Sequence, residues 1–209
     1  MLTPEQLEEI TRRQREMLVR YLCEHPASVG GKWVLDVGTG SGVIAVFAAS
    51  LGAARVIALD KDPEAIRCAQ ANAARYGFQD MIEVRLSDMF EALQAYERFE
   101  VVTANLPFRD MPAADSAERT MWDPGLESNR RFFADVGHYL APGGIVYLAQ
   151  ANFGALSEVP GLARAAGFSE RFIGENDLSR DDPTDSRIFC VYGLQKRLPE
   201  RPAENGQKV

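Results

Sequence analysis

The sequence predicts an α/β fold, built as a doubly wound, mostly parallel sheet of seven strands with one antiparallel strand near its edge. Short apolar segments alternate with segments of helical periodicity five times before residue 150, which is the order of parallel strands joined by crossover helices. A final pair of strand-like segments is separated by a largely polar loop, as in an antiparallel hairpin. A chain of 209 residues is long enough for one such domain and too short for two.

A helix is predicted at the N-terminus, within residues 1–30, ahead of a domain at residues 31–196. Thr3 stands at the N-cap, with Pro4 at the first helical position and Gln6 three residues after the cap, which is a capping-box pattern. Pro26 ends the segment. Basic and acidic residues interleave along this helix, so a solvated face is expected, with a surface that docks a partner as the alternative: Arg12, Arg13, Arg15, Glu8, Glu9 and Glu16.

The remaining elements follow from periodicity and from the glycines and prolines between them. Strands are predicted from residue 33 to Asp36, and at 55–60, 81–86, 99–104, 145–149, 168–173 and 187–194. Helices are predicted at 43–49, 63–76, 124–140 and 155–166, with Pro142-Gly143-Gly144 as the stop signal after 140. Residues 197–209 are polar and contain prolines, so they are expected to form a flexible tail.

The sequence VLDVGTGSG joins the first predicted strand to the helix that follows it. Its glycines, Gly38, Gly40 and Gly42, alternate with small residues, so the backbone can adopt positive φ and approach a ligand closely. A dinucleotide-binding turn would need glycine at position 43, which is Val43. The spacing therefore indicates a different polar ligand on this turn, or a plain turn between strand and helix.

An acidic residue also ends the second predicted strand. Asp60 lies twenty residues after Gly40, about the offset at which a carboxylate binds ribose hydroxyls in nucleotide-binding βαβ units. The alternative is that Asp60 caps the helix at 63–76, but Asp62 stands directly before Pro63 and is the better cap. Asp60 is therefore interpreted as a ribose ligand.

Asp36 followed by this glycine spacing resembles motif I of the class I S-adenosylmethionine-dependent methyltransferases. The resemblance extends over roughly residues 34–167 and implies a Rossmann-like methyltransferase fold, with S-adenosyl-L-methionine as cofactor of the domain at 31–196. It also implies that Asp88 contacts the adenine amino group and that Met89 packs on the ring, with loop capping by Asp88 as the alternative. The implied cofactor-binding residues are Asp36, Gly38, Thr39, Gly40, Gly42, Asp60, Lys61, Asp88, Met89 and Asn105.

The fourth predicted strand runs into Asn105-Leu106-Pro107-Phe108, which resembles the motif [N/D]-[P/I/L]-P-[Y/F/W] of methyltransferases that alkylate a planar nitrogen. Such a nitrogen is a poor nucleophile because its lone pair is delocalised. Hydrogen bonds from its N–H groups to the Asn105 side-chain oxygen and the Leu106 carbonyl would pyramidalise it. Pro107 would hold Leu106 extended, and Phe108 would stack on the flat group. These four residues are the predicted catalytic residues, with an ordinary strand exit as the alternative.

The candidate residues fall at comparable places in the predicted sheet. Asp36, Gly38, Asp60, Asp88 and Asn105 all lie at or just after the end of a predicted strand. Ligands of doubly wound sheets bind over the carboxyl ends of the strands, beside the first strand. We therefore expect these residues to line one crevice.

The methyl acceptor is predicted from resemblance alone. Segments 122–133 and 140–144 look like the region after the NPPY-type motif in glutamine N5-methyltransferases and related small-domain N-methyltransferases. This implies N-methylation of a planar amide or amine nitrogen, on a protein side chain (glutamine-like) or a small molecule. The alternatives are an RNA adenine or guanine N-methyltransferase and a non-catalytic subunit of the same fold. Residues 109–121 would form a substrate lid or a solvated loop.

Composition and charge narrow the partners and the compartment. The net charge of -7 argues against unspecific nucleic-acid binding. The N-terminus lacks a secretory pattern, and no apolar run approaches the length of a membrane span. The cysteines are far apart, which is typical of reduced residues in a cytoplasmic protein and predicts no metal site. An accessory subunit or a homodimer is compatible with the sequence.

Overall fold

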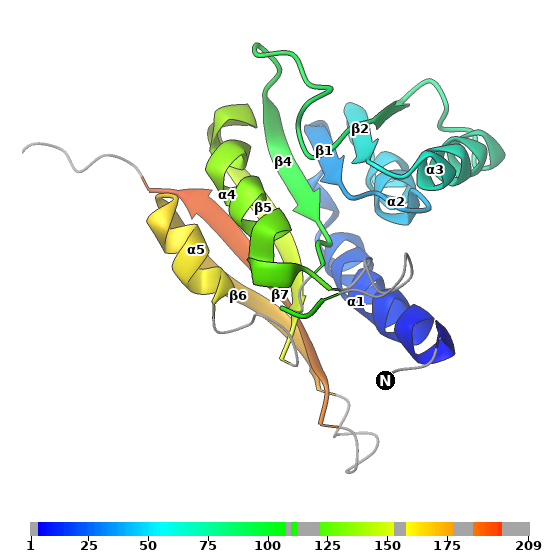
Figure 1. Ribbon diagram of the computed structural model, residues 1–209. Helices are drawn as coiled ribbons and strands as arrows, with labels where there is room; N and C mark the ends of the chain where they lie inside the picture. Colours follow the sequence, from blue (N-terminus) through cyan, green and yellow to red (C-terminus); the bar gives the residue numbers. More distant parts are fainter. Residues whose placement is uncertain (1–3, 108–109, 113–121, 153–157, 178–185, 198–209) are drawn as a thin grey trace, which may run out of the picture.

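The computed structural model (Figure 1) describes residues 4–107, 110–112, 122–152, 158–177 and 186–197 and contains one seven-stranded sheet. The strands are β1 (Trp33–Val37), β2 (Arg55–Asp60), β3 (Ile82–Leu86), β4 (Phe99–Ala104), β5 (Leu140–Ala151), β6 (Phe168–Asp177) and β7 (Ile188–Lys196). Their order in the sheet is β3-β2-β1-β4-β5-β7-β6. β7 is antiparallel to both of its neighbours, and the other pairs are parallel. The prediction of a doubly wound sheet with one antiparallel strand near the edge is confirmed.

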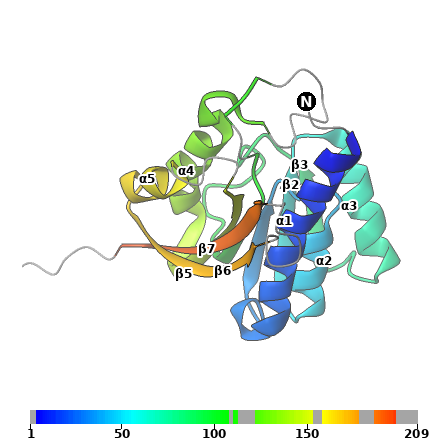
Figure 2. The same ribbon diagram turned by 90° about the horizontal axis from the view of Figure 1, so that it is seen from below.

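Helices cover both faces of the sheet. They are α1 (Pro4–Glu24), α2 (Val43–Ser50), α3 (Pro63–Arg75), α4 (Glu127–Tyr139) and α5 (Val159–Ala165), with short 3-10 turns η1 (Pro26–Ser28) and η3 (Pro124–Leu126). The first three α-helices lie on one face and the last two on the other, as the view from below shows (Figure 2). The strand order reverses beside β1, where β2 and β4 flank it. This switch point is where ligands of such sheets bind.

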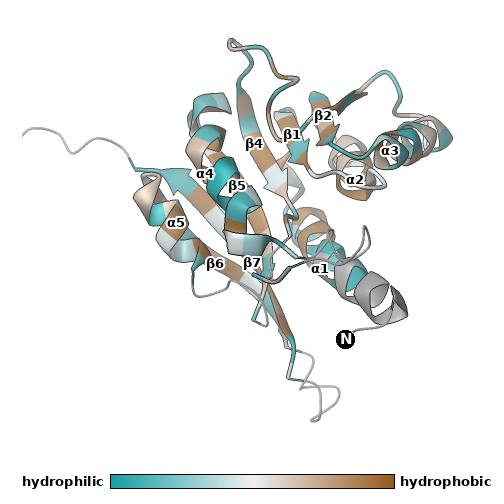
Figure 3. Cartoon of the chain, viewed as in Figure 1, coloured by the Kyte–Doolittle hydropathy of each residue, from teal (hydrophilic) through white to brown (hydrophobic). Residues whose placement is uncertain are grey.

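Side chains of the central strands alternate between two hydrophobic clusters, because successive residues of a strand point to opposite faces. On β2, Val56 and Ala58 pack in the cluster under α1 and α2, whereas Ile57 and Leu59 pack in the cluster under α4 and α5. All four side chains are buried. The hydropathy view shows the same apolar character along β1, β2 and β4 (Figure 3). The carboxyl ends of these strands are thus held on a rigid base.

Several predicted boundaries are wrong: β6 extends to Asp177 and not to residue 173, and the largest errors lie around α4 and β5. β5 begins at Leu140, so Pro142-Gly143-Gly144 lies inside the strand and does not separate it from α4. Gly143 has φ 76, and the pairing of β4 with β5 shifts beyond Phe99, so these residues form a strand irregularity. The predicted helix at 124–140 is divided into η3 and α4 because Gly125 and Leu126 adopt left-handed φ values of 66 and 54.

Some predictions fall outside the described residues. These are the Thr3 cap, the stacking role of Phe108, the first turn of the helix at 155–166, most of the proposed lid at 109–121 and the tail from 198 onward. Asp62 is confirmed as the cap of α3, since its carboxylate accepts the Glu64 amide at 2.8 Å. In the part of the chain that the structure describes, no helix has the length and apolar character needed to span a bilayer.

Candidate active site

The glycine turn follows β1 at the switch point of the sheet. Gly38, Gly40 and Gly42 all have positive φ, between 56 and 78. A Cβ added at Gly42 would lie 3.0 Å from the Cα of Ala69, so this glycine lets α2 and α3 approach each other. A Cβ at Gly40 would meet no heavy atom within 4 Å. The turn is therefore tightly packed on its α3 side and open above Gly40.

Asp36 is a fully buried carboxylate just before this turn. Thr39 Oγ1 donates to its Oδ2 at 2.6 Å, and Thr103 Oγ1, on the neighbouring β4, donates to its Oδ1 at 2.7 Å. Burial raises the pKa of Asp36 to about 6, while the two hydroxyl bonds act in the opposite direction. Asp36 therefore ties the turn to both central strands, and Thr103 is a partner that the sequence did not indicate.

Asp60 crosses from the end of β2 to the glycine turn. Its Oδ2 accepts the Gly40 amide at 2.8 Å, and its Oδ1 accepts the Asp62 amide at 3.0 Å. A carboxylate offers about four acceptor positions, so these bonds leave capacity for two hydroxyl donors. The side chain is half-buried at the mouth of the turn, and Lys61 beside it is exposed. This placement is compatible with the predicted ribose role, which stays a prediction.

The loop after β3 carries Asp88 and Met89. Ser87 Oγ donates to the Met89 carbonyl at 2.9 Å and accepts the Ala92 amide at 3.0 Å. Met89 has φ 54, an uncommon conformation for a residue other than glycine, and such positions tend to occur at functional sites. The loop is thus held in one shape by its own side chains.

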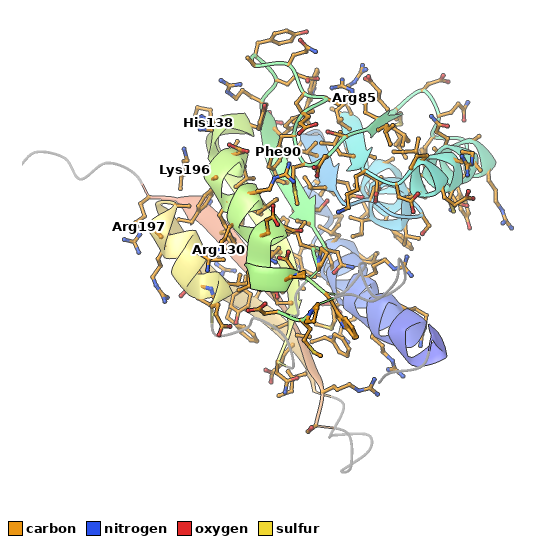
Figure 4. All side chains as sticks on the ribbon, in the orientation of Figure 1. Arg85, Phe90, Arg130, His138, Lys196 and Arg197 are labelled. Atoms are coloured by element: carbon orange, nitrogen blue, oxygen red, sulfur yellow. The ribbon has the colours of Figure 1, made fainter. Side chains whose placement is uncertain are left out.

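A second contact joins this loop to α4. Arg131 Nη1 donates to Asp88 Oδ2 at 2.9 Å, and about two fifths of each side chain is exposed. Phe90 is buried against Phe132 and Tyr139 of α4, with ring centroids 5.8 and 5.2 Å away (Figure 4). Asp88 uses one acceptor position of Oδ2 in this ion pair, and its adenine contact stays a prediction.

The segment Asn105-Leu106-Pro107 leaves β4 directly beside the glycine turn. The position of a Cβ on Gly38 would lie 3.9 Å from the Asn105 carbonyl oxygen, so the two loops are in contact distance. Asn105 as a residue is half-buried, yet its Oδ1 atom is shielded from solvent and has no hydrogen-bond partner. An unpaired buried acceptor is costly and calls for an explanation.

Asp123 and Asn129 hold this segment from the α4 side, and neither was predicted. Both are buried. Asn129 Nδ2 donates to the Pro107 carbonyl at 2.7 Å and to Asp123 Oδ2 at 2.8 Å. Asp123 also accepts the backbone amides of Ser128 and Asn129 at 2.8 and 3.1 Å. The start of α4 is thereby fastened to the predicted nitrogen-binding loop.

Part of the predicted set lies together at one edge of the sheet, whereas the printed contacts of Asp88 and Met89 are with α4 and with their own loop. Asp36, Gly38 and Asp60 contact the same turn, and Asn105 lies beside it. Within the described ranges no group of His, Cys, Asp and Glu could hold a metal ion. His138 lies at the opposite end of α4 from Arg130, away from this edge (Figure 4). The arrangement suits an organic ligand over the glycine turn.

The chain is similar to known methyltransferases over the residues of this site. The family described as ribosomal protein L11 methyltransferase (PrmA) matches residues 19–108, which include the glycine turn, Asp60, Asp88 and Asn105. This part of the chain is therefore similar to a PrmA-type methyltransferase domain. The chain is 36% identical over 149 residues to the release factor glutamine methyltransferase of Koribacter versatilis, covering 65% of this chain and 52% of that protein.

Other relatives are named either release factor glutamine methyltransferase or ribosomal protein L11 methyltransferase. The ribosomal protein L11 methyltransferase of Vibrio cholerae is 40% identical over 118 residues, 50% of this chain and 39% of that protein. The chain spans about half the length of the curated relatives it matches. Among solved structures, the ribosomal protein L11 methylase of Lactobacillus delbrueckii subsp. bulgaricus has a TM-score of 0.63 at 20% identity, over 86% of this chain and 78% of that one.

A second structural neighbour was solved with ligands. It is the Thermus thermophilus 16S rRNA N2 G1207 methyltransferase in complex with AdoMet and guanosine, with a TM-score of 0.64 at 23% identity, covering 90% of this chain and 43% of that one. At such identities the likeness concerns the fold. It confirms the Rossmann-like methyltransferase architecture predicted for the domain.

Proposed function

We propose that this chain is an S-adenosylmethionine-dependent N-methyltransferase that acts on a planar amide or amine nitrogen. The observation that carries the proposal is the Oδ1 atom of Asn105, which is buried and lacks a hydrogen-bond donor at the end of β4. An N–H group of an acceptor would supply that donor. The names of the relatives, which are methyltransferases of a glutamine and of a ribosomal protein, support the same reaction class.

The residues at the glycine turn fit the cofactor. The space above Gly40 is open at the backbone, and Asp60 has acceptor capacity left for ribose hydroxyls. When bound, S-adenosyl-L-methionine supplies an electrophilic methyl group on a sulfonium. The proposed cofactor ligands are those implied by the resemblance: Asp36, Gly38, Thr39, Gly40, Gly42, Asp60, Lys61, Asp88, Met89 and Asn105.

The residues after β4 would activate the acceptor by position. Asn105 Oδ1 and the Leu106 carbonyl would accept the two N–H groups, so that the lone pair leaves conjugation and points toward the glycine turn. Pro107 keeps Leu106 out of the helical region, and the Asn129 bond to the Pro107 carbonyl holds the loop in place. No strong base is required, because the nitrogen becomes acidic once it is alkylated. Positioning and exclusion of water would supply most of the rate.

A protein side chain, glutamine-like, is the acceptor that the relatives favour, and a small molecule would fit the same loop. The printed names concern a release factor glutamine and a ribosomal protein. An enzyme acting on such translation proteins would work in the cytoplasm. Since this chain spans only about half of those relatives, an accessory subunit or a second copy of the chain could complete substrate recognition.

The exocyclic amine of an RNA base is the second candidate. The same pair of acceptors would bind an aromatic amine, and one structural neighbour holds guanosine. The net charge of -7 counts against it, because RNA binding depends largely on neutralising phosphates. Competition by polyanions would separate the two classes of acceptor.

Calorimetry with S-adenosyl-L-methionine tests the cofactor half of the proposal. We expect Asp60→Ala to weaken binding about tenfold or more, because hydrogen bonds to a charged group are lost. Asp80→Ala, an exposed carboxylate away from the turn, is the matched control and should bind as the wild type does. Binding that survives Asp60→Ala unchanged would remove Asp60 from the site.

Transfer of a labelled methyl group to fractionated cell extract tests the acceptor half. We expect label in protein or in small molecules. Asn105→Ala should abolish transfer but leave the affinity for the cofactor nearly intact, because the other proposed cofactor ligands are still present. Label that enters RNA instead would favour the second candidate. Full transfer by Asn105→Ala would refute the role of the Asn105 amide.

A further inference from the structure

Arg15 on α1 reaches the glycine turn. Its Nη1 atom donates to Ser41 Oγ at 3.3 Å, and Ser41 stands between Gly40 and Gly42. Arg15 was expected on a solvated face of the helix, but the residue is half-buried. The helix itself packs against α2 and β5, with Leu18 and Leu22 in the core (Figure 2). Arg15 is therefore held at the turn by the packing of its helix.

Other arginines of α1 differ from Arg15 in their partners. Arg12 pairs with Glu16, and Arg20 pairs with Glu24 at 3.5 Å, both one helical turn away. Among the described residues, Arg15 has a hydroxyl as its partner and no carboxylate. A half-buried guanidinium has lost part of its hydration, which costs free energy. A bond to a neutral oxygen compensates for this less than an opposite charge would. The site thus favours an anion that would complete the pair.

The glycine turn adds to this preference for an anion. α2 starts at Val43, directly after the turn, and the free amides of a helix N-terminus attract negative charge. The nearby carboxylates are already engaged, Asp36 with two threonine hydroxyls and Asp60 with two backbone amides. The amide of Asn72 fixes the Ser41 carbonyl at 2.8 Å, which keeps the loop in place.

We propose that Arg15 is the counter-ion for the carboxylate at the methionine end of the cofactor, so that α1 forms part of the cofactor site. This inference rests on the proposed function and assigns one end of the same ligand. A guanidinium binds a carboxylate through two parallel N–H groups, which a single ammonium cannot do. Arg15 would exchange its Ser41 contact for the carboxylate or hold both, because the guanidinium has five N–H donors.

Two ligands separate this role from a structural one. S-Adenosylhomocysteine carries the amino acid end, and 5′-methylthioadenosine lacks it, while both contain the adenosine that Asp60 is proposed to bind. By calorimetry, Arg15→Ala should bind S-adenosylhomocysteine about tenfold to hundredfold more weakly than the wild type does, which is the range for lost charge-assisted hydrogen bonds. The affinity of Arg15→Ala for 5′-methylthioadenosine should stay within about twofold of the wild-type affinity. Arg15→Lys should show an intermediate loss, since it keeps the charge and loses the fork.

The controls make each outcome decisive. Arg20→Ala removes an exposed arginine on the same helix and should bind both ligands normally. Asp60→Ala should weaken both ligands together, which shows that the assay detects the adenosine half. Equal losses of both ligands in Arg15→Ala and Arg15→Lys, or no loss in either variant, would overturn the inference while leaving the proposed function intact. A wild-type protein that binds neither ligand would contradict the proposed function itself, and this inference with it.

Discussion

Asn129 Nδ2 donates a hydrogen bond to the carbonyl oxygen of Pro107 at 2.7 Å. The same amide group donates to Asp123, whose carboxylate also accepts two backbone amides at the start of α4. Flipping the Asn129 amide would set its oxygen against both acceptors, so the network fixes the orientation. The loop that is proposed to bind the acceptor nitrogen therefore takes its position from α4 as well as from β4.

Replacing Asn129 should impair turnover more than folding of the cofactor site. We expect Asn129→Ala to lower kcat by about tenfold to hundredfold, because a misplaced loop loses the alignment of Asn105. Affinity for S-adenosyl-L-methionine, measured by calorimetry, should change less than about threefold. Ser128→Ala on the same turn of α4 is the control, since the Ser128 contact to Asp123 uses its backbone amide. Equal losses of turnover and cofactor binding would indicate a general structural role for Asn129.

Two glycines of the turn should respond differently to alanine. Gly42→Ala combines a left-handed φ of 78 with a Cβ 3.0 Å from the Cα of Ala69, so urea unfolding should show a loss of about 2–4 kcal/mol. Gly40→Ala meets no atom within 4 Å and should lose only about 1–2 kcal/mol. It should instead lower cofactor affinity, since the methyl group enters the open space. The reverse order of stabilities would contradict this account of the turn.

The buried carboxyl group of Asp36 should make stability depend on pH. Burial raises its pKa to about 6, so the folded protein binds this proton more tightly than the unfolded chain does. Its protonation stabilises the fold at low pH, and this contribution is lost as the pH rises through about 6. Between pH 4 and pH 7, the free energy of unfolding of the wild type should fall by on the order of 2–3 kcal/mol relative to that of Asp36→Asn.

Urea unfolding of both proteins at the two pH values measures this difference. Threonine hydroxyls can rotate to donate to or accept from the new amide, so Asp36→Asn should fold. Asp135→Asn, at an exposed position on α4, reports the effect of the same chemical change at the surface. A wild type that gains stability over Asp36→Asn as the pH rises would refute the assignment.

The pair of Arg85 and Glu97 should act in the opposite direction with pH. The two terminal nitrogens of Arg85, Nη1 and Nη2, each donate to the buried Glu97 carboxylate at 3.0 Å, and these bonds lower the pKa of Glu97. The pair therefore stabilises the fold at pH values above the ordinary range for glutamate, and the contribution is lost as the pH falls. Glu97→Gln should destabilise the protein by about 1–3 kcal/mol at pH 7. The difference in free energy of unfolding between Glu97→Gln and the wild type, measured by urea unfolding, should be smaller at pH 4. A larger difference at pH 4 would contradict the assigned role of the pair.

Much of the fold could be predicted because local signals agreed with the tertiary structure. The strands β2 and β4 have the predicted bounds, since each is a short, mostly apolar run whose end is marked by a polar residue, Asp60 at the end of β2 and Asn105 directly after β4. The errors occurred where local signals were ambiguous. Pro142-Gly143-Gly144 has the composition of a turn, but the residues on either side of it are paired, Leu140 with Phe99 and Ile145 with Val101 and Gln195, so the strand continues across this irregularity. No sequence signal showed that Leu126 would adopt a left-handed φ.

In the candidate site, too, residues marked by a local sequence signal could be located, and residues that depend on long-range contacts could not. The positions of Asp36, Asp60 and Asn105 could be predicted because each stands at the carboxyl end of a strand, and their roles stay predictions. Thr103, Asn129 and Arg15 could not be predicted, because their roles depend on contacts between residues distant in sequence. Arg15 also lies among glutamates and other arginines, so its pattern matched a solvated helix face.

The most direct test of the central proposal is the chemical position of the transferred methyl group. Labelled product from the extract assay would be digested to amino acids, nucleosides and small molecules, and the methylated compound identified by mass spectrometry. The account predicts label on an amide or amine nitrogen, and acid hydrolysis of a methylated amide would release labelled methylamine. Label found on oxygen, sulfur or carbon would contradict the role assigned to Asn105 and Leu106.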